Sequence, residues 1–318
     1  MMIRAALFPL ACLAVTACVP IEEGPSNQSL PVSKVSPEKL AEWRKNNPDW
    51  YASVEPFRVI GDEERGVYHV GTEGLSMYFI PTEDGHIVID GGMPDQGEYV
   101  ADAIRKLGYD PADIKILLNS HAHLDHSGGL AALKDISGAE LFASEGDRSA
   151  LESGHYLGSE DEIWLNAPPV KVDHIIADGE KVTLGSVTLT ARFTPGHSRG
   201  CTSWTMSQPV AGNSLDILFF CSASVAANRL FFPPQYEGIV DDYRKTFAIT
   251  KNWKPDIFLS NHPFFFKMGE KRKRLLAGEP EAFVDDTEFP KFIAKLAVDF
   301  DKALLKQKAT MEKPGNIK

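Results

Sequence analysis

The most constraining feature of this sequence is a group of metal-ligand side chains placed directly after a short apolar run. The run, residues 114–118, has the length of a buried strand, and a helix is expected to begin near Leu130. Between the two lie four side chains of the types that bind metal ions, namely His121, His123, Asp125 and His126. Layered α/β folds build their sites in loops of this kind, at the ends of strands.

The spacing within this group indicates two ions. His121 and His123 are two residues apart, so in an extended stretch they point the same way and can share one ion. Asp125 and His126 fall on the following turn and can face a second ion. Imidazole nitrogens with a single carboxylate suit zinc better than magnesium or calcium, which prefer oxygen shells.

Two more of the nine histidines have a comparable setting. His197 follows the strand-like run at residues 187–193, and His262 follows the run at residues 256–259. Both are therefore candidate ligands at strand ends. The histidines without such a setting are interpreted as ordinary strand or loop residues: His69, His86 and His174.

On these residues the chain resembles the metallo-β-lactamase superfamily, and specifically its class B, subclass B3 enzymes. The resemblance extends from about Pro56 to about Phe300, with landmarks at residues 70–76, 90–94, 121–126, 194–197, 222–224 and 261–263. It implies an α/β fold, the αββα sandwich. The patterns agree with this fold, because strand-like runs fall into two sets, at residues 57–90 and 182–221, with helical periodicity between and after them.

The resemblance also implies a ligand set. Zinc 1 would be held by His121, His123 and His197, and zinc 2 by Asp125, His126 and His262. Many superfamily members place a bridging aspartate after the strand that corresponds to residues 215–221, and two lactamase subclasses place a cysteine there. Here Ser222 aligns with that position, as in the subclass that uses His126. A shift of one residue in register would instead point Cys221 into the site.

The activity implied by the resemblance is hydrolysis of the β-lactam amide bond of penicillins, cephalosporins and carbapenems. A hydroxide shared by the two zinc ions would attack, with Asp125 orienting it. Ser222 and Ser224 would bind the carboxylate of the antibiotic, and Asp90 would support the metal loop without binding an ion. The alternatives are a lactonase or a glyoxalase II-like thioesterase on the same fold, or an exported binding protein without activity.

Charge argues against a nucleic-acid substrate. The formal net charge is −11, which disfavours the RNase Z branch of the superfamily because a polyphosphate backbone would be repelled. The one basic run, residues 271–274, is interpreted as a solvated helix face. We therefore expect a small-molecule substrate, a β-lactam, and no nucleic-acid partner. We also expect a monomer.

Two features between the landmarks leave alternatives open. Cys201 and Cys221 lie on runs expected to be neighbouring strands, so they form either a disulfide or two buried free thiols. The segment at residues 151–164 lies between elements. It is either a plain surface loop or a substrate loop that uses His155, Tyr156 and Trp164.

The amino terminus predicts export. Residues 1–17 carry one basic residue and then an apolar stretch too short to span a bilayer, which is typical of a signal peptide. The sequence ending at Cys18 resembles a bacterial lipobox, so this cysteine is a candidate lipid anchor; a simple signal peptidase site is the alternative. Residues 18–50 are predicted to form a tether and N-terminal segment, and residues 51–318 the catalytic domain, in the periplasm.

Overall fold

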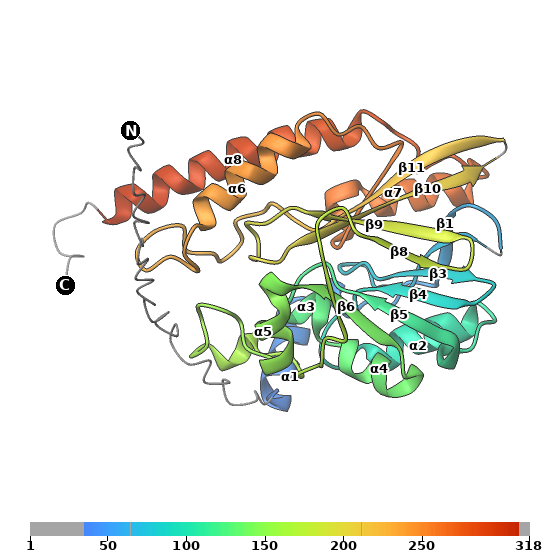
Figure 1. Cartoon of the computed structure of the whole chain (residues 1–318), viewed down its shortest axis with the longest axis horizontal. Coiled ribbons are helices and arrows are strands. Elements are labelled where there is room, and N and C mark those ends of the chain that lie inside the picture. The colour runs from blue at the N-terminus through green and yellow to red at the C-terminus, as the bar shows by residue number, and fades with distance from the viewer. Residues whose placement is uncertain (1–34, 64, 211, 312–318) are drawn as a thin grey trace, which may run out of the picture. The chain divides into compact units, whose positions relative to one another are not determined.

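The computed structural model describes residues 35–63, 65–210 and 212–311. Two β-sheets lie face to face in this part of the chain (Figure 1). The first has seven strands in sequence order: β1 (Phe57–Ile60), β2 (Val67–His69), β3 (Tyr78–Thr82), β4 (Gly85–Ile89), β5 (Ile114–Leu118), β6 (Glu140–Ser144) and β7 (His174–Ile176). The second has the order β12 (Ile257–Ser260), β11 (Asn213–Phe220), β10 (Thr202–Val210), β9 (Val187–Phe193) and β8 (Lys181–Leu184).

Helices cover the outer faces of the two sheets (Figure 1). Those beside the first sheet are α2 (Gly97–Lys106), α3 (Leu124–Ser127), α4 (Leu130–Ser137) and α5 (Glu145–Ser153). Those beside the second are α6 (Ile239–Thr250), α7 (Met268–Leu276) and α8 (Glu288–Met311). The amino-terminal helix α1 (Pro37–Asn46) and the short turns η1 (Pro48–Trp50), η2 (Pro111–Asp113), η3 (Ile163–Leu165) and η4 (Pro263–Phe266) complete the described elements. The predicted αββα sandwich is thus confirmed.

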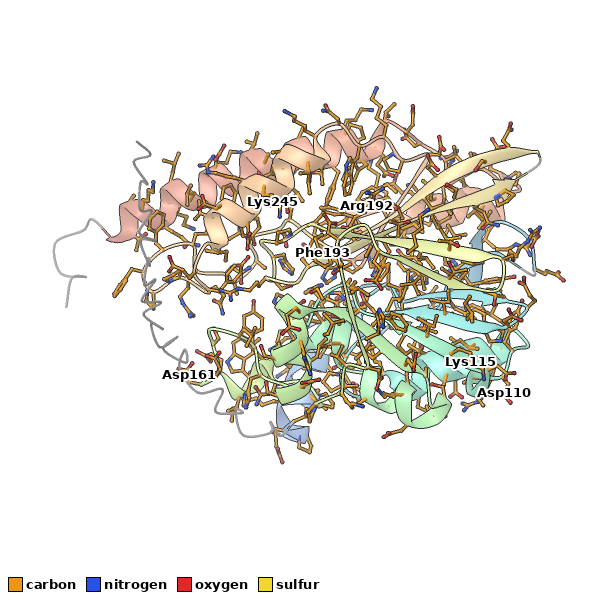
Figure 2. All side chains as sticks on the ribbon, in the orientation of Figure 1. Asp110, Lys115, Asp161, Arg192, Phe193 and Lys245 are labelled. Carbon is orange, nitrogen blue, oxygen red and sulfur yellow. A yellow bond between two sulfur atoms is a disulfide. The ribbon has the colours of Figure 1, made fainter. Side chains whose placement is uncertain are left out.

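Successive side chains along a strand point to opposite faces of the sheet, and this creates the two main apolar layers. In β4 the side chains of Ile87 and Ile89 face the second sheet, where they join a core that includes Trp204. Val88, between them, faces the other way and packs in the layer with Ile104 of α2. Charged side chains such as Lys115 stay on the surface (Figure 2). Of the strands that lead into the site, β5 and β12 are buried along most of their length, whereas β9 alternates between buried and partly exposed side chains.

The structure differs from the sequence prediction at several elements. Strands β6 and β7 were not predicted, and the turn expected at Asp125 is the short helix α3. The basic run lies on α7, but the interpretation as a solvated face is wrong for Lys271, which is buried and forms an ion pair with the buried Glu288.

The amino-terminal predictions fall mostly outside the described residues. The signal peptide at residues 1–17 and the lipid anchor at Cys18 lie there, whereas α1 lies within the predicted segment 18–50 and packs its Trp43 against the first layer of helices. Among the described helices, none combines the length and the hydropathy needed to cross a membrane.

Candidate metal centre

The loop that carries the first ligands follows β5, a strand hydrogen-bonded on both sides in the parallel part of the first sheet. After the strand the chain turns into α3, which has His123 at its N-cap and carries Asp125 and His126 in its single turn. Glycines let this turn pack against the loop after β4. A Cβ atom on Gly129 would lie 2.2 Å from the carbonyl oxygen of Gly91, so only glycine fits there.

The six predicted ligands lie in two groups of three. Within each group the candidate ligand atoms are all within 4.8 Å of one another, and the groups are His121, His123 and His197, and Asp125, His126 and His262. In the second group a carboxylate oxygen of Asp125 lies 3.1 Å from Nε2 of His126 and 3.5 Å from Nε2 of His262. The structure therefore brings together side chains from the ends of β5, β9 and β12, as the sequence predicts.

The donor chemistry of both groups fits metal ions. Nε2 of His121 is buried and has no hydrogen-bond partner among the described residues. A buried nitrogen in this state is costly unless a cation accepts its lone pair. Three nitrogens in one group, and two nitrogens with one carboxylate in the other, are donor sets typical of zinc. Each group is also small enough for one ion.

The protonation states favour metal binding. Burial lowers the pKa of His197 and of His262 to about 4, and it lowers the pKa of His121 and of His123 well below the ordinary value. These imidazoles are therefore neutral at physiological pH, which is the form that binds a metal. Burial alone would raise the pKa of Asp125, but the neighbouring His126 and His262 hold it below its usual range, so the carboxylate is ionised.

Backbone carbonyls orient two of the imidazoles. Nδ1 of His197 lies 2.8 Å from the carbonyl oxygen of Ser224, and Nδ1 of His262 lies 3.1 Å from that of Gly74. Donation from Nδ1 fixes the tautomer and leaves Nε2 free to bind a cation.

Asp90 supports the loop in the way that was predicted for it. Its carboxylate accepts hydrogen bonds from the backbone N–H and the hydroxyl of Ser120, at 2.7 and 2.6 Å. The Ser120 hydroxyl also lies 3.1 Å from Nδ1 of His121. Burial raises the pKa of Asp90 to about 6. Asp90 is thus connected to the ligand His121 through the hydroxyl of Ser120.

Sequence reasoning missed a second buried carboxylate, that of Asp147 on α5. It accepts hydrogen bonds from the N–H of Ala122 at 3.0 Å, the hydroxyl of Ser198 at 2.8 Å and the N–H of Gly200 at 2.9 Å. These partners flank the ligands of two separate loops, so Asp147 ties the loops together. Burial raises its pKa to about 6. No local pattern distinguishes it from the exposed acid Glu145 in the same helix.

Only part of the segment at residues 151–164 contacts the site. Tyr156 stacks on His123, with ring centroids 4.4 Å apart, and its hydroxyl bonds Asn228. Beside these rings lies a cavity of about 270 Å³ that His197 and Asp147 also line. Trp164 lies away from this cavity, against Trp43, with ring centroids 5.6 Å apart.

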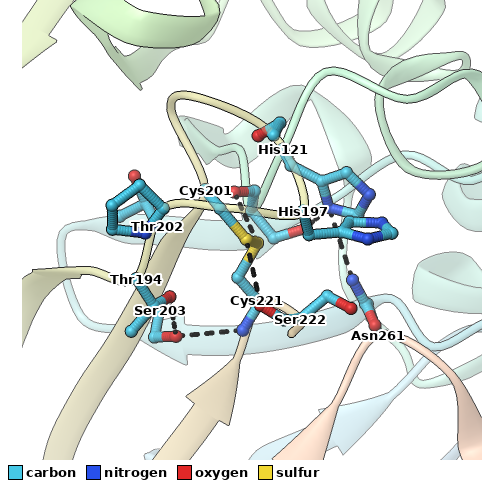
Figure 3. The surroundings of a disulfide bond; sticks show 12 residues. His121, Thr194, His197, Cys201, Thr202, Ser203, Cys221, Ser222 and Asn261 are labelled. Atoms are coloured by element: carbon cyan, nitrogen blue, oxygen red, sulfur yellow. Dashed lines mark hydrogen bonds between the residues drawn. A yellow bond between two sulfur atoms is a disulfide. The ribbon is translucent and has the colours of Figure 1, made fainter. Parts of the chain in front are cut away.

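The open question about the cysteines is settled in favour of a disulfide between Cys201 and Cys221, whose Cα atoms are 5.9 Å apart (Figure 3). Cys221 therefore offers no free thiolate to the site. The next residue, Ser222, has its hydroxyl 3.2 Å from that of Ser224, which in turn lies 3.4 Å from Nδ1 of His197. The two serines are thus side by side at the edge of the first group of ligands.

Known proteins share both the sequence pattern and the fold. A family model described as the metallo-beta-lactamase superfamily matches residues 70–208. BJP-1, a subclass B3 metallo-beta-lactamase of Bradyrhizobium japonicum, is 46% identical, with 83% of this chain and 98% of that chain covered and a TM-score of 0.80. FEZ-1 of Legionella gormanii is 33% identical, with 81% and 98% covered and a TM-score of 0.77.

More distant relatives have other names. The N-acyl homoserine lactonase AttM of Agrobacterium fabrum is 25% identical over 190 residues, which is 47% of this chain and 65% of the relative. The identity to the subclass B3 enzyme is higher and extends over nearly the whole of that protein. On this basis, the chain belongs to the metallo-β-lactamase superfamily of metal-binding hydrolases, and within it to the group of the subclass B3 enzymes.

Proposed function

We propose that this protein hydrolyses the amide bond of β-lactam antibiotics with two zinc ions, one at each group of three ligands. The observation that carries the proposal is the composition of the second group. It is complete with Asp125, His126 and His262, while Cys201 and Cys221 are engaged in a disulfide and the serine pair lies beside His197 of the first group. This is the arrangement expected of subclass B3, whose solved members are the relatives with the highest identity given above.

The ions would be held by the carboxylate of Asp125 and by the five imidazoles of the two groups. When bound, they supply a nucleophile by lowering the pKa of water, and they stabilise negative charge that develops on the carbonyl oxygen and the leaving nitrogen. The carboxylate of Asp125 is ionised and buried, so it can accept a hydrogen bond from the attacking water and hold it in position. No side chain is required to form a covalent bond with the substrate.

The serine pair provides the contact that selects the substrate. β-Lactam antibiotics carry a carboxylate next to the reacting ring, and two adjacent hydroxyls can both donate to one carboxylate. Ser222 and Ser224 lie beside His197, so an anion bound to them would place the reacting amide near both groups of ligands. This contact distinguishes a β-lactam from an N-acyl homoserine lactone, which carries no carboxylate.

The decisive experiment compares substrate classes with the same preparation. Purified mature protein with added zinc is assayed against a penicillin, a cephalosporin and a carbapenem, and beside them an N-acyl homoserine lactone and a glutathione thioester. We expect efficient turnover of at least one β-lactam and at most weak activity on the lactone and the thioester. Cleavage of the lactone or the thioester without opening of any β-lactam would refute the proposal and leave the fold and the metal centre intact.

We further propose that the protein is a monomer exported to the periplasm. The apolar segment at residues 1–17 supports export, and a disulfide in the folded domain is typical of an oxidising compartment. Cell fractionation locates the protein, size-exclusion chromatography gives its oligomeric state, and mass spectrometry of the mature amino terminus decides between a lipidated Cys18 and a simple cleavage site. Retention in the cytoplasm with residues 1–17 uncleaved would contradict export.

A further inference from the structure

The residues just before the first sheet pack against the second group of ligands. Residues 37–52, here called the N-terminal bracket, comprise α1, η1 and the two residues that follow. The rings of Trp43 and Trp50 stack within the bracket, with centroids 5.3 Å apart and an interplanar angle of 13°. The ring of Trp50 lies 5.8 Å from the imidazole of His262. The bracket thus forms an aromatic wall beside one ligand.

A second connection runs through the backbone. The N–H of Gly74 donates to the carbonyl of Asp49 at 2.9 Å, and the N–H of Glu73 donates to the carbonyl of Ala52 at 3.0 Å. The carbonyl of Gly74 is the group that accepts from Nδ1 of His262. A Cβ atom on Gly74 would lie 2.6 Å from Cδ1 of Trp50, so the two residues are in close contact. The bracket therefore touches both the ring of His262 and the carbonyl that orients it.

The bracket is itself held at both ends. The carbonyl of Trp50 accepts a hydrogen bond of 2.6 Å from Nε2 of Gln96, whose Oε1 accepts from the N–H of Met93 at 2.9 Å. At the other end, Nε1 of Trp43 donates to the carbonyl of Trp164 at 3.0 Å. These contacts restrict the rotation of Trp50, so it can in turn restrict a neighbouring side chain.

We propose that Trp50 is a positioning residue for His262, and that the N-terminal bracket helps to hold this ligand in the orientation that binds the second ion. The inference rests on the proposed second ion. A ligand held in its binding orientation loses less conformational freedom when the ion binds, and loss of such support typically costs 10- to 100-fold in metal affinity. The first group of ligands has other supports, because His123 stacks on Tyr156 and His197 bonds the carbonyl of Ser224.

The test measures the two metal affinities separately. Metal-free protein is titrated with Co²⁺, whose absorption reports the geometry of each site, and with Zn²⁺ in competition with a chromogenic chelator. For Trp50→Ala we expect the dissociation constant of the second ion to rise by about 10-fold or more, and that of the first to stay within about threefold. Trp50→Phe keeps an aromatic face and is expected to restore most of the affinity.

The matched control is Trp253→Ala. Trp253 is also half-buried, but it packs against Phe289, with ring centroids 6.3 Å apart, in a different apolar cluster from that of Trp50. This variant is expected to lower the melting temperature of the metal-free protein and to leave both dissociation constants unchanged. If Trp50→Ala does not fold, Trp43→Ala removes the ring that stacks on Trp50 and should weaken the second ion in the same direction.

The outcomes separate this inference from the proposed function. Wild-type protein that binds two ions, together with a Trp50→Ala variant that binds both with unchanged affinity, overturns the inference alone. An equal loss at both sites, or a loss in the Trp253 control as large as in Trp50→Ala, also overturns it, because either result indicates a general loss of stability. Wild-type protein that binds a single ion overturns the two-zinc proposal and the inference together.

Discussion

The Sγ atom of Cys221 lies 3.2 Å from the carbonyl oxygen of Ser120, the residue that precedes the first histidine ligand. Cys221 is at the same time bonded to Cys201 at the start of the neighbouring strand. The disulfide therefore connects the strand ends from which two site loops leave, and it touches a third loop. It lies beneath the ligands and supports them without contributing one (Figure 3).

This relationship predicts the behaviour of a variant without the disulfide. Replacing Cys201 and Cys221 together by Ser should leave zinc content near two per chain, because neither sulfur is a ligand. Stability should fall by about 3 kcal/mol in the chain-entropy description, since the bridge closes a loop between residues 20 apart. Elemental analysis and urea unfolding check the two expectations. Loss of one zinc from a folded variant would assign a ligand role to a cysteine.

Removal of the metal should abolish activity and lower stability together. Six donors that converge without an ion leave buried imidazoles unpaired and close to an ionised carboxylate, whereas bound ions stabilise the folded state in proportion to their affinity. A chelator is therefore expected to inactivate the protein and lower its melting temperature, and added zinc to reverse both. Elemental analysis that finds less than about one metal per chain in active protein would contradict this.

Loss of a ligand from the second group should reduce the rate of the reaction itself. His262→Ala and Asp125→Ala each remove a donor, and Asp125→Ala also removes the acceptor that holds the attacking water. We expect kcat for a penicillin or carbapenem to fall by about two orders of magnitude or more, the scale of losing a preorganised charge-stabilising group. Steady-state kinetics test this, with the exposed His174→Ala as a control that should behave as wild type.

The serine pair should instead affect substrate binding. Ser222→Ala with Ser224→Ala removes two hydroxyls that would hold a carboxylate in both the ground state and the transition state. KM for a β-lactam is expected to rise by about 10-fold or more, while kcat stays within about threefold. A fall in kcat with an unchanged KM would show that the serines serve the metal centre rather than the substrate.

A buried histidine outside the two ligand groups should make folding sensitive to acid. His69 in β2 is buried against Phe57 and Tyr78, and burial, with a smaller contribution from Arg272, lowers its pKa to about 3. The unfolded chain protonates this group near pH 6.5, so it binds more protons than the folded protein between about pH 6.5 and 3. The contribution of neutral His69 to stability is therefore fully present above about pH 6.5 and is lost as the pH falls from there toward about 3.

The variant that isolates this effect is His69→Phe. Relative to it, the wild type should lose about 2 kcal/mol of unfolding free energy between pH 6 and pH 4.5, because one pKa unit corresponds to about 1.4 kcal/mol. Urea unfolding at a series of pH values gives the difference. A pH profile for His69→Phe that runs parallel to that of the wild type would contradict the assignment.

The sequence was most informative where local pattern and chemistry coincide. The run before His121 is β5 with the bounds that were predicted, because four of its five side chains are apolar and buried and only Lys115 is exposed. The six candidate ligands also converge as two groups, since strand ends in a layered fold meet at one edge. Their roles as ligands remain predictions until metal is measured.

The features that sequence reasoning missed depend on distant partners. Strand β7 has three residues, two of them exposed, and it exists because it pairs with β6. Asp147 is buried because loops more than 20 residues away offer it hydrogen bonds. Lys271 is buried because Glu288 begins the next helix beside it. Nothing within a short window of sequence reports these relationships.

The chain order of the ligands has a consequence for biosynthesis. The first group is complete once the chain has folded through His197, but the second requires His262, which follows β12, the edge strand of the second sheet. A chain that stops before residue 262, or that fails to add this strand, can assemble only the first group. Under the two-ion proposal, an occupied second group therefore requires that synthesis has passed residue 262 and that β12 has joined the second sheet.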